Sequence, residues 1–479
     1  MSETALPEKK LGHLTRMAFG VGGAAGGIKN NGFDYALLIF YSQVLGLPSW
    51  WVAGAIWIAL IIDAISDPIV GYWSDNLRFS LGRRHPFMYA AALPVAVAYF
   101  FVWNPPTGLE GVPLFAWLLA LTILVRVGYT LFEVPSLSLA AELSQDYDIR
   151  TMLMSYRYFF AWVGGLTVQV MLFVVFLEPS EGDPQGYQHL PGWNTYGLVA
   201  GAIIFGAILI TALGTHRRIP HLMSPPPKRD LSIQKIFAEI WETLSNPSFR
   251  ALFIATLFGL LATGISASLN FYMNGFFWNF TAEQIGILTM SVFLSTIMAL
   301  TVAPIAGRVW GKKRAAIIIG LLAFTLAPAP VFARLFGLLP ENGTPELFAI
   351  VLTITVFDVA LIIAYQMLAA SMVTDIVEES ELKTKRRSEG TFFAGITFIR
   401  KLSQGVGVAS ASLILMVASI APGAPIEDAS ADSVAALGWG YATTLLAVWM
   451  LMIFAISFYR ISREDHARNL EELAARQAE

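Results

Sequence analysis

Residues 62–84 read IDAISDPIVGYWSDNLRFSLGRR, and they join the end of an apolar segment to a loop rich in glycine and arginine. Residues 50–61 before them are apolar throughout. Together they are long enough for a membrane-spanning helix, which needs about 20 mostly apolar residues. Two carboxylates, Asp63 and Asp67, interrupt the apolar run. Acidic side chains are costly inside a bilayer and usually mark functional positions there. The stretch therefore indicates a membrane helix whose two carboxylates have a function.

The composition of the whole chain is typical of a membrane protein. Of its 479 residues, 56% are hydrophobic and 14% are charged, whereas soluble domains carry about 25% charged residues. The mean hydropathy of +0.61 points the same way. A net charge of -3 suggests no nucleic-acid partner, and the lack of cysteine excludes disulfides and thiol chemistry. We expect no cleavable signal peptide, so the first apolar segment would direct insertion.

Apolar segments of spanning length recur along the chain, separated by glycine, proline and charged residues. Backbone polar groups in lipid must bond within their own segment, so we expect every one to be an α-helix. The twelve predicted segments are Leu14–Leu45, Trp50–Tyr72, Phe87–Val102, Pro113–Leu143, Met154–Leu177, Tyr196–Leu213, Leu252–Met273, Ile285–Val309, Ala315–Leu335, Leu347–Thr374, Thr391–Met416 and Ala435–Tyr459.

Basic residues gather in alternate loops, and Arg334 is the exception on the other side. They follow the second, eighth and tenth segments and fill the central linker: Arg78, Arg83, Arg84, Arg308, Lys312, Lys313, Arg314, Lys383, Lys385, Arg386, Arg387, Arg217, Arg218, Lys228, Arg229 and Lys235. Because basic loops stay on the cytoplasmic side, the pattern predicts that both termini and the linker are cytoplasmic. An even number of segments agrees with this orientation.

The loop after the second segment has a shorter relative after the eighth. The first carries Gly71, Asp75, Gly82, Arg83 and Arg84, and the second carries Gly307, Arg308, Gly311, Lys312 and Lys313. Such a repeat at half the chain length predicts two pseudo-symmetric six-helix bundles, at 1–215 and 248–479, joined by a cytoplasmic linker at 216–247. The predicted fold is therefore an all-α membrane protein, and the loop resembles the signature of the major facilitator superfamily.

Asp63 and Asp67 lie four residues apart and share one helix face. Their like charges repel, and a cation between them would relieve the repulsion and the cost of burial. Ser66 offers a hydroxyl oxygen, and Pro68 frees a carbonyl one turn earlier because it has no N–H. Oxygen ligands of this kind suit Na⁺ or a proton. The alternative is a carboxylate pair that is neutralised by arginines of neighbouring helices.

Further polar residues interrupt the other segments. They are Lys29, Asn30, Asn31 and Asp34 in the first, Arg126, Tyr129, Thr130 and Glu133 in the fourth, Arg157 in the fifth, Asp358 in the tenth, and Arg400 and Lys401 in the eleventh. Arg126, Thr130 and Glu133 follow one helical stripe. A structural ion pair and a transport role both stay open for Arg126 and for Asp358. The glycines between Gly20 and Gly32 predict close helix packing.

Residues 63–71, DAISDPIVG, resemble the second-helix motif of the glycoside–pentoside–hexuronide:cation symporters. Other parts of the chain resemble this family in order and spacing: Tyr129-Thr130 with Glu133-Val134-Pro135, Arg157-Tyr158-Phe159-Phe160, and Asp375 to Glu381 followed by Arg387, Glu389 and Lys401. The resemblance covers most of the chain, and the second-helix motif is its most specific part.

The resemblance implies a cation site and a substrate site. It implies that Asp63, Asp67 and Glu133 hold the coupling cation with help from Thr130, with Asp63 and Asp67 as Na⁺ ligands if the ion is not a proton; the Ser66 hydroxyl adds to this site. It implies that Glu133, Arg157 and Tyr129 contact the substrate and that Lys401, near the cation site, helps to bind cation or substrate. Asn30 and Asp34 are expected to supply further substrate contacts from the first segment. This chain departs from galactoside-binding members at Gly26-Gly27, Leu137 and Ser66. The solute and the choice between Na⁺ and H⁺ therefore stay open.

The leading hypothesis is cation-coupled symport of a sugar or glycoside by alternating access. The alternatives are a cation-coupled carrier of a lysolipid or another organic solute, and a membrane sensor that binds solute without moving it. An enzyme is not expected, because the six histidines lie mostly in loops or near the termini and no nucleophile or metal-ligand spacing is present. We expect no cofactor beyond the coupling ion, and a monomer in the bacterial inner membrane.

Overall fold

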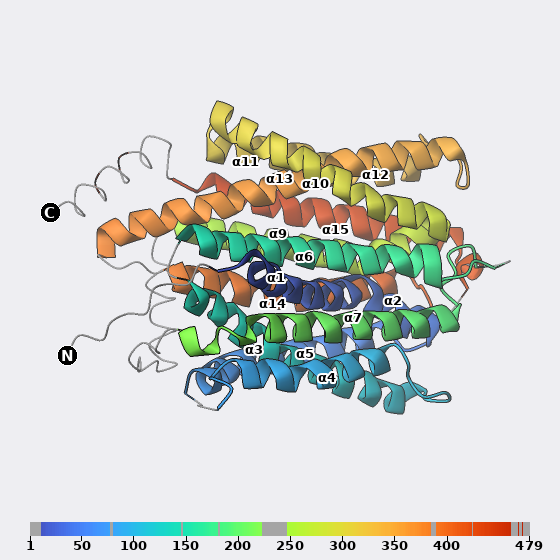
Figure 1. Cartoon of the computed structure of the whole chain (residues 1–479). Coiled ribbons are helices and arrows are strands. Elements are labelled where there is room, and N and C mark those ends of the chain that lie inside the picture. Colours follow the sequence, from blue (N-terminus) through green and yellow to red (C-terminus); the bar gives the residue numbers. More distant parts are fainter. Residues whose placement is uncertain are drawn as a thin grey trace, which may run out of the picture. The chain divides into compact units, whose positions relative to one another are not determined.

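The computed structural model describes residues 11–76, 80–144, 147–180, 183–222, 247–384, 389–423, 425–460, 468 and 472 (Figure 1). Some predicted features lie outside the described residues. These are Arg78, the linker residues 223–246, and the side chains of residues 373–399, which include Asp375, Arg387 and Glu389.

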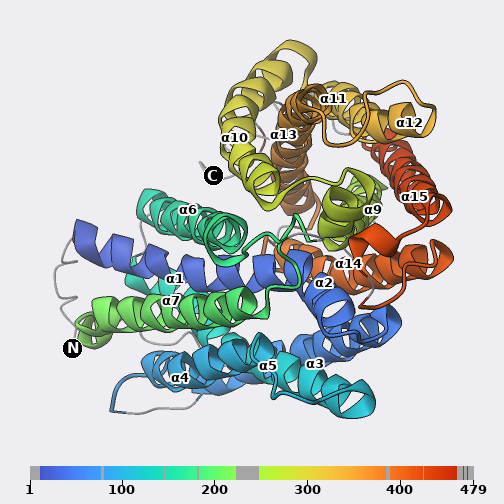
Figure 2. The same cartoon turned by 90° about the vertical axis from the view of Figure 1, so that its right-hand side faces the viewer.

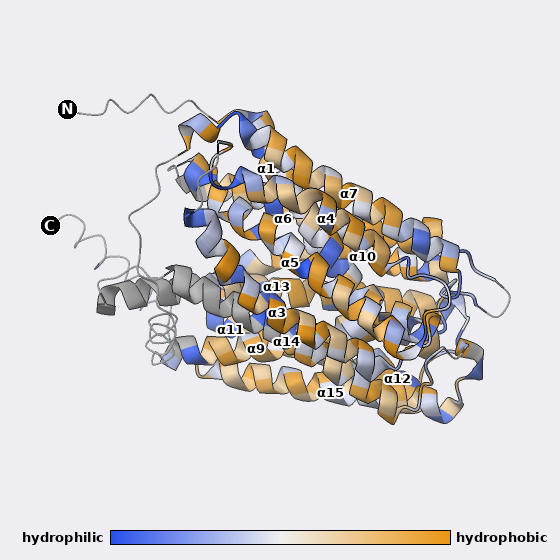
Figure 3. Ribbon diagram, turned by 90° about the horizontal axis from the view of Figure 1, so that it is seen from below, coloured by the Kyte–Doolittle hydropathy of each residue, from blue (hydrophilic) through white to orange (hydrophobic). Residues whose placement is uncertain are grey.

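The described residues form the predicted set of membrane-spanning helices. Ten of these helices are long and apolar enough to cross a bilayer. Two further segments are helical but less apolar: the first, which is rich in glycine and contains Lys29, and α14 (Glu389–Val417), which contains Arg400 and Lys401. Apolar residues dominate the helices in Figure 3. The prediction of twelve spanning helices is confirmed.

The chain divides into two compact units, each built from more than one stretch of sequence. Unit 1 comprises Met1–Phe33, Ile58–Leu177 and His189–Pro227, and unit 2 comprises Asp34–Trp57, Glu178–Gln188 and Lys228–Glu479. The boundary therefore passes through the first two predicted segments. The simpler division at residues 216–247 stays a prediction.

The first half of the chain carries the helices that form most of unit 1. Its elements are α1 (His13–Asn31), η1 (Gly32–Ala36), α2 (Leu37–Ile39), η2 (Phe40–Val44), α3 (Ser49–Asn76), α4 (His85–Val102), α5 (Gly111–Leu143), α6 (Tyr147–Met171), η3 (Leu172–Phe176), α7 (Leu190–His216) and η4 (Ile219–His221). Helices α3 and α5 run unbroken through Pro68 and Pro135.

The second half of the chain carries most of unit 2, and Figure 2 shows its helices side by side in one bundle. The predicted ninth segment is divided at Pro328 into two helices, because proline cannot continue the hydrogen bonding of the first. The elements are α9 (Pro247–Tyr272), η5 (Met273–Phe277), α10 (Ala282–Trp310), α11 (Lys312–Leu326), α12 (Ala329–Leu335), α13 (Pro345–Thr384), α14, η6 (Ile426–Asp428) and α15 (Ala431–Ser457).

Helix packing repeats between the two halves of the chain. Helix α1 packs against α6 and α7, and its counterpart six segments later, α9, packs against α14 and α15. Likewise α4 packs against α5 and α7, and its counterpart α11 packs against α13 and α15. The same order of neighbours in both halves is the arrangement of the predicted pseudo-symmetric bundles.

Glycines of α1 allow α6 to approach closely, as predicted. A Cβ atom at Gly23 would overlap the backbone oxygen of Arg157, and one at Gly27 would overlap that of Ala161. Small residues let helix backbones come together in this way. The close approach fixes the position of Arg157 within unit 1.

Candidate functional site

The predicted carboxylate pair of α3 meets one hydroxyl group of α5. The hydroxyl oxygen of Thr130 lies 3.0 Å from Oδ1 of Asp63 and 3.0 Å from Oδ1 of Asp67. Asp63 and Thr130 are 4% and 2% exposed, so water does little to screen the charge of Asp63, while Asp67 is half-buried. A hydroxyl has a single proton to donate and cannot satisfy both carboxylates at once. The three oxygen atoms therefore converge on a place that suits a small hard cation or a proton.

Arg126 of α5 lies on the other side of Asp63. Its NH1 atom is 3.7 Å from Oδ2 of Asp63, and both side chains are buried. The guanidinium group also lies 5.4 Å from the centre of the Phe33 ring. The arginine alternative from the sequence therefore holds for Asp63, which has Arg126 beside it.

Tyr129 lies at the centre of the polar interior of unit 1. The Nζ atom of Lys29 is 4.4 Å from the centre of its ring. The phenol group lies within electrostatic range of Glu133, Arg157 and Asp63. The structure therefore brings Tyr129, Glu133 and Arg157 of the predicted substrate site together beside the predicted cation site.

Arg157 of α6 is 6% exposed and lies between two aromatic rings. Its guanidinium carbon is 5.8 Å from the ring centre of Phe19 and 5.6 Å from that of Phe132. The terminal nitrogens NH1 and NH2 are buried, and the phenol group of Tyr129 is the polar group beside the guanidinium. A guanidinium has five N–H donors, more than one phenol oxygen can accept, so Arg157 is suited to binding a ligand that accepts hydrogen bonds.

The other predicted site residues are Ser66, Asn30, Asp34 and Lys401. Ser66 donates its hydroxyl to the backbone oxygen of Asp63 at 3.0 Å, so its lone pairs stay available as acceptors. Asn30 is exposed at the end of α1. Asp34 and Lys401 belong to unit 2, where Asp34 accepts a hydrogen bond from Gln404 of α14. Asp34 and Lys401 are therefore described with unit 2 and not with the cluster of unit 1.

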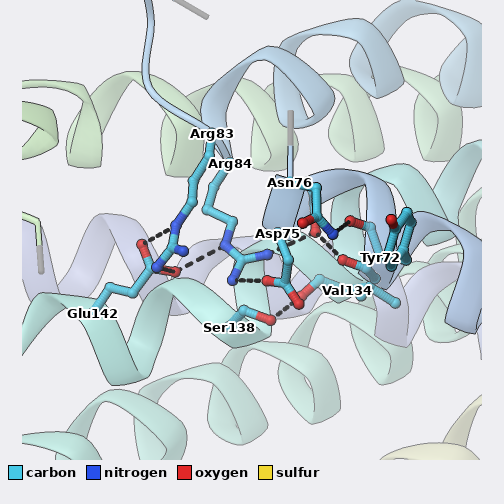
Figure 4. Close-up of polar contacts among 10 residues, drawn as sticks. Tyr72, Asp75, Asn76, Arg83, Arg84, Val134, Ser138 and Glu142 are labelled. Carbon is cyan, nitrogen blue, oxygen red and sulfur yellow. Dashed lines mark hydrogen bonds and ion pairs between the residues drawn. The ribbon is translucent and has the colours of Figure 1, made fainter. Parts of the chain in front are cut away.

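Ion pairs and hydrogen bonds connect the loop after α3 to the end of α5 (Figure 4). Glu142 accepts from Nε of Arg84 at 2.8 Å and pairs with NH2 of Arg83 at 2.8 Å. Arg84 also donates to Ser74 at 2.6 Å and pairs with Asp75 at 2.5 Å. Arg84 and Glu142 are buried, whereas the Asp75 side chain is 56% exposed. The arginines of the predicted loop signature therefore have a structural partner that the motif itself does not contain.

Glu142→Gln is expected to lower the free energy of unfolding by about 3 kcal/mol, because it leaves the buried Arg84 and the half-buried Arg83 without their shared carboxylate. The remaining pair of Arg84 with Asp75 keeps the loss at the low end of the range for broken buried pairs. Thermal unfolding of the purified protein measures the effect. Asp75→Asn is the matched control and should cost less than about 1 kcal/mol, because Asp75 is largely exposed. Equal losses in the two variants would contradict this account.

Several contributors to the site could not be identified from the sequence. Phe19 and Phe132 are ordinary aromatic residues of apolar helices, and their contact with Arg157 depends on helix packing. The sequence shows Lys29 as a charged residue in an apolar segment but does not predict its neighbour. In the structure its Nζ atom lies over the Tyr129 ring.

Comparisons with known proteins agree with this picture. Residues 18–463 match the model of the family described as MFS/sugar transport protein. An uncharacterised symporter of Synechocystis is 26% identical over 99% of this chain and 98% of its own length. A putative sulfoquinovose importer of Salmonella typhimurium is 24% identical over 98% of this chain and 94% of its own length.

The fold also has relatives among solved structures. The crystal structure of a D-xylose–proton symporter superposes with a TM-score of 0.62 at 14% identity, covering 92% of this chain and 96% of the other. At this identity the likeness concerns the fold. The family match extends over nearly the whole chain, and it assigns the protein to transport and not to catalysis. The chain therefore belongs to the MFS/sugar transport protein family, a branch of the major facilitator superfamily.

Proposed function

We propose that this transporter carries a sugar or glycoside by symport with one monovalent cation, Na⁺ or H⁺. The observation that carries the proposal is the shared hydroxyl of Thr130, which lies 3.0 Å from both Asp63 and Asp67. The two carboxylates and the hydroxyl supply oxygen ligands of the kind that a hard monovalent cation takes. Similarity to a symporter and to a putative sulfoquinovose importer supports coupled transport of a sugar.

The solute would bind beside the cation, at Arg157, Tyr129 and Glu133. A guanidinium donates to hydroxyl or anionic oxygens, while a carboxylate accepts from hydroxyl groups. Charge-assisted hydrogen bonds of this kind are the strong ones, and they would provide most of the selectivity. The density of charge around Arg157 favours a polar solute over a lysolipid.

The two sites would be coupled through α5. Thr130 and Glu133 lie on one stripe of this helix, so a cation that draws Asp63 and Asp67 toward Thr130 also orients Glu133 for the solute. By reciprocity, bound solute strengthens cation binding by the same factor. This linkage is what a symporter needs in order to move both ligands together.

The test is thermal stabilisation of the purified protein by neutral and acidic sugars, with and without Na⁺ and at two pH values. A ligand at 100 times its Kd should stabilise the folded state by about 2.7 kcal/mol. Uptake of the stabilising sugar into proteoliposomes then distinguishes a carrier from a sensor. A protein that no sugar stabilises, or that binds sugar without moving it, would contradict the proposal.

We also propose that both termini face the cytoplasm of a bacterial inner membrane, on the basis of the basic loops. A reporter that folds only in the periplasm should be active when inserted at Glu178, between η3 and α7. The same reporter should be inactive at either terminus. The opposite pattern would overturn the orientation.

A further inference from the structure

An apolar groove of about 350 Å³ lies between the start of α1 and the first half of α6. The two helices belong to unit 1, pack against each other and lie side by side in Figure 2. None of the groove residues belongs to the proposed cation or solute site. One of them comes from α1 and the others from α6: Met17, Met152, Ser155, Tyr156, Phe159 and Phe160. A wall of thioether and aromatic side chains suits a hydrocarbon chain.

Two residues of α1 place nitrogen donors at one end of this groove. The NH1 atom of Arg16 donates to Sδ of Met152 at 3.2 Å. The Nε2 atom of His13 lies 3.1 Å from the hydroxyl oxygen of Tyr156, and the two rings pack edge to face with their centres 6.0 Å apart. Both residues of α1 therefore contact the wall of the groove, and Arg16 brings a positive charge to it.

Arg16 lacks a strong hydrogen-bond acceptor in the described part of the chain. A thioether sulfur accepts only weakly, and Nε of Arg16 is buried with no hydrogen-bond partner. None of the described carboxylates forms an ion pair with Arg16. Because a guanidinium is a planar fork of five N–H donors, it fits the oxygens of a phosphate or carboxylate two at a time. The group that Arg16 needs is therefore an anionic oxygen acceptor.

The groove extends from the boundary of the bilayer into its apolar part. The candidate membrane span of α6 begins at Met152. Phe160 lies more than two turns further along α6, about 12 Å deeper at 1.5 Å per residue. Apolar side chains around the groove are exposed, since Leu14 and Phe159 have exposed fractions of 82% and 58%. Arg16 thus lies at the level of the lipid headgroups, and Phe160 lies at the level of the acyl chains.

We infer that this groove binds one anionic phospholipid. Its phosphate accepts hydrogen bonds from Arg16 and from the free ring nitrogen of His13, and one acyl chain lies along the apolar wall toward Phe160. Charge-assisted hydrogen bonds from arginine to phosphate are strong, and basic pockets between membrane helices bind lipid headgroups in this way. A free phosphate ion would leave the apolar wall uncovered, so the groove favours the lipid.

The bound lipid would connect the starts of α1 and α6. These are the two helices whose close packing at Gly23 and Gly27 positions Arg157. An anionic lipid at the groove should therefore stabilise the folded state of unit 1. The inference does not depend on which solute the protein carries, because none of its residues belongs to the proposed solute site.

The experiment follows thermal unfolding of the purified full-length protein in a neutral detergent as lipid is added. Dioleoyl phosphatidylglycerol should stabilise the wild type at about tenfold lower concentration than dioleoyl phosphatidylcholine, whose headgroup has no net charge. Arg16→Gln removes the guanidinium and should weaken the effect of phosphatidylglycerol about tenfold or more. Arg217→Gln is the matched control, because it removes an exposed arginine at the end of α7 that does not line the groove, and it should respond like the wild type.

Two further variants test the two ends of the lipid separately. Ser155→Trp places an indole in the groove at an exposed position of α6, so it should weaken binding of the acyl chain and with it the phosphatidylglycerol effect. Arg16→Lys keeps the charge but loses the fork, so its response should fall between those of the wild type and Arg16→Gln. It also carries the test if Arg16→Gln does not fold. Inorganic phosphate alone should not stabilise the protein.

Three outcomes would overturn the inference. Equal stabilisation by phosphatidylglycerol and phosphatidylcholine would mean that the groove does not select an anionic headgroup. A wild-type response in Arg16→Gln would mean that Arg16 does not bind the phosphate. Stabilisation by inorganic phosphate that Arg16→Gln removes and Ser155→Trp leaves intact would make the site one for a small anion and not for a lipid. Each of these outcomes leaves the proposed symport unchanged.

Discussion

Replacing either Asp63 or Asp67 by asparagine should abolish the dependence of solute binding on the coupling cation. Asparagine keeps the shape of the side chain but removes one of the two negative charges that Thr130 bridges. Either change leaves one carboxylate at the Thr130 hydroxyl, so a cation has one charged ligand fewer and gains less free energy by binding. The coupling free energy of about 1–3 kcal/mol, or about 5–150-fold in affinity, would be lost.

The measurement is solute affinity with and without Na⁺, at two pH values, in the wild type and in each variant. Binding that is independent of the cation can persist, because the predicted solute residues are intact. Asp75→Asn serves as the control, since Asp75 lies on the same helix but at its exposed end. An unchanged cation-linked shift in both variants would place coupling elsewhere. A wild-type shift that follows pH and ignores Na⁺ would keep the site and identify the ion as a proton.

Arg157→Ala should reduce solute affinity by at least about 100-fold, because it removes two charge-assisted hydrogen-bond donors, each contributing about 1.5–3 kcal/mol. Both terminal nitrogens of Arg157 are buried, and the Tyr129 phenol beside them cannot accept from all of the guanidinium donors. Cation binding should stay measurable, since Asp63, Asp67 and Thr130 keep their contacts. The readouts are solute affinity and cation-induced thermal stabilisation of the same preparation.

Two variants separate a binding role for Arg157 from a structural one. Arg157→Lys keeps the charge but cannot present two parallel donors, so its solute affinity should fall between those of the wild type and Arg157→Ala. Arg150→Ala changes an arginine at the start of the same helix, where Nε donates to the backbone oxygen of Ser144 at 2.6 Å. It should leave solute affinity unchanged. Unchanged affinity in Arg157→Ala would make Arg157 a packing residue between Phe19 and Phe132.

Local features of the fold and of the site could be predicted from the sequence. The apolar segments were located because a bilayer demands a minimum length of apolar helix. The shared face of Asp63 and Asp67 followed from the period of the α-helix, and the stripe of Thr130 and Glu133 followed from the same period. The glycines of α1 predicted a close helix contact, which the structure assigns to α6. In each case the relevant residues lie within a few turns of one helix.

Tertiary structure decided which helix faces met. Arg126 lies beside Asp63, and Glu142 binds Arg83 and Arg84, although roughly 60 residues separate the partners in each case. Arg157 lies between Phe19 and Phe132, whose apolar helices offer no sign of that role. Asp34 joins unit 2 although most of the first segment belongs to unit 1. The period of a helix determines which residues share a face, but the neighbour of that face depends on the packing of all the helices together, which no local pattern contains.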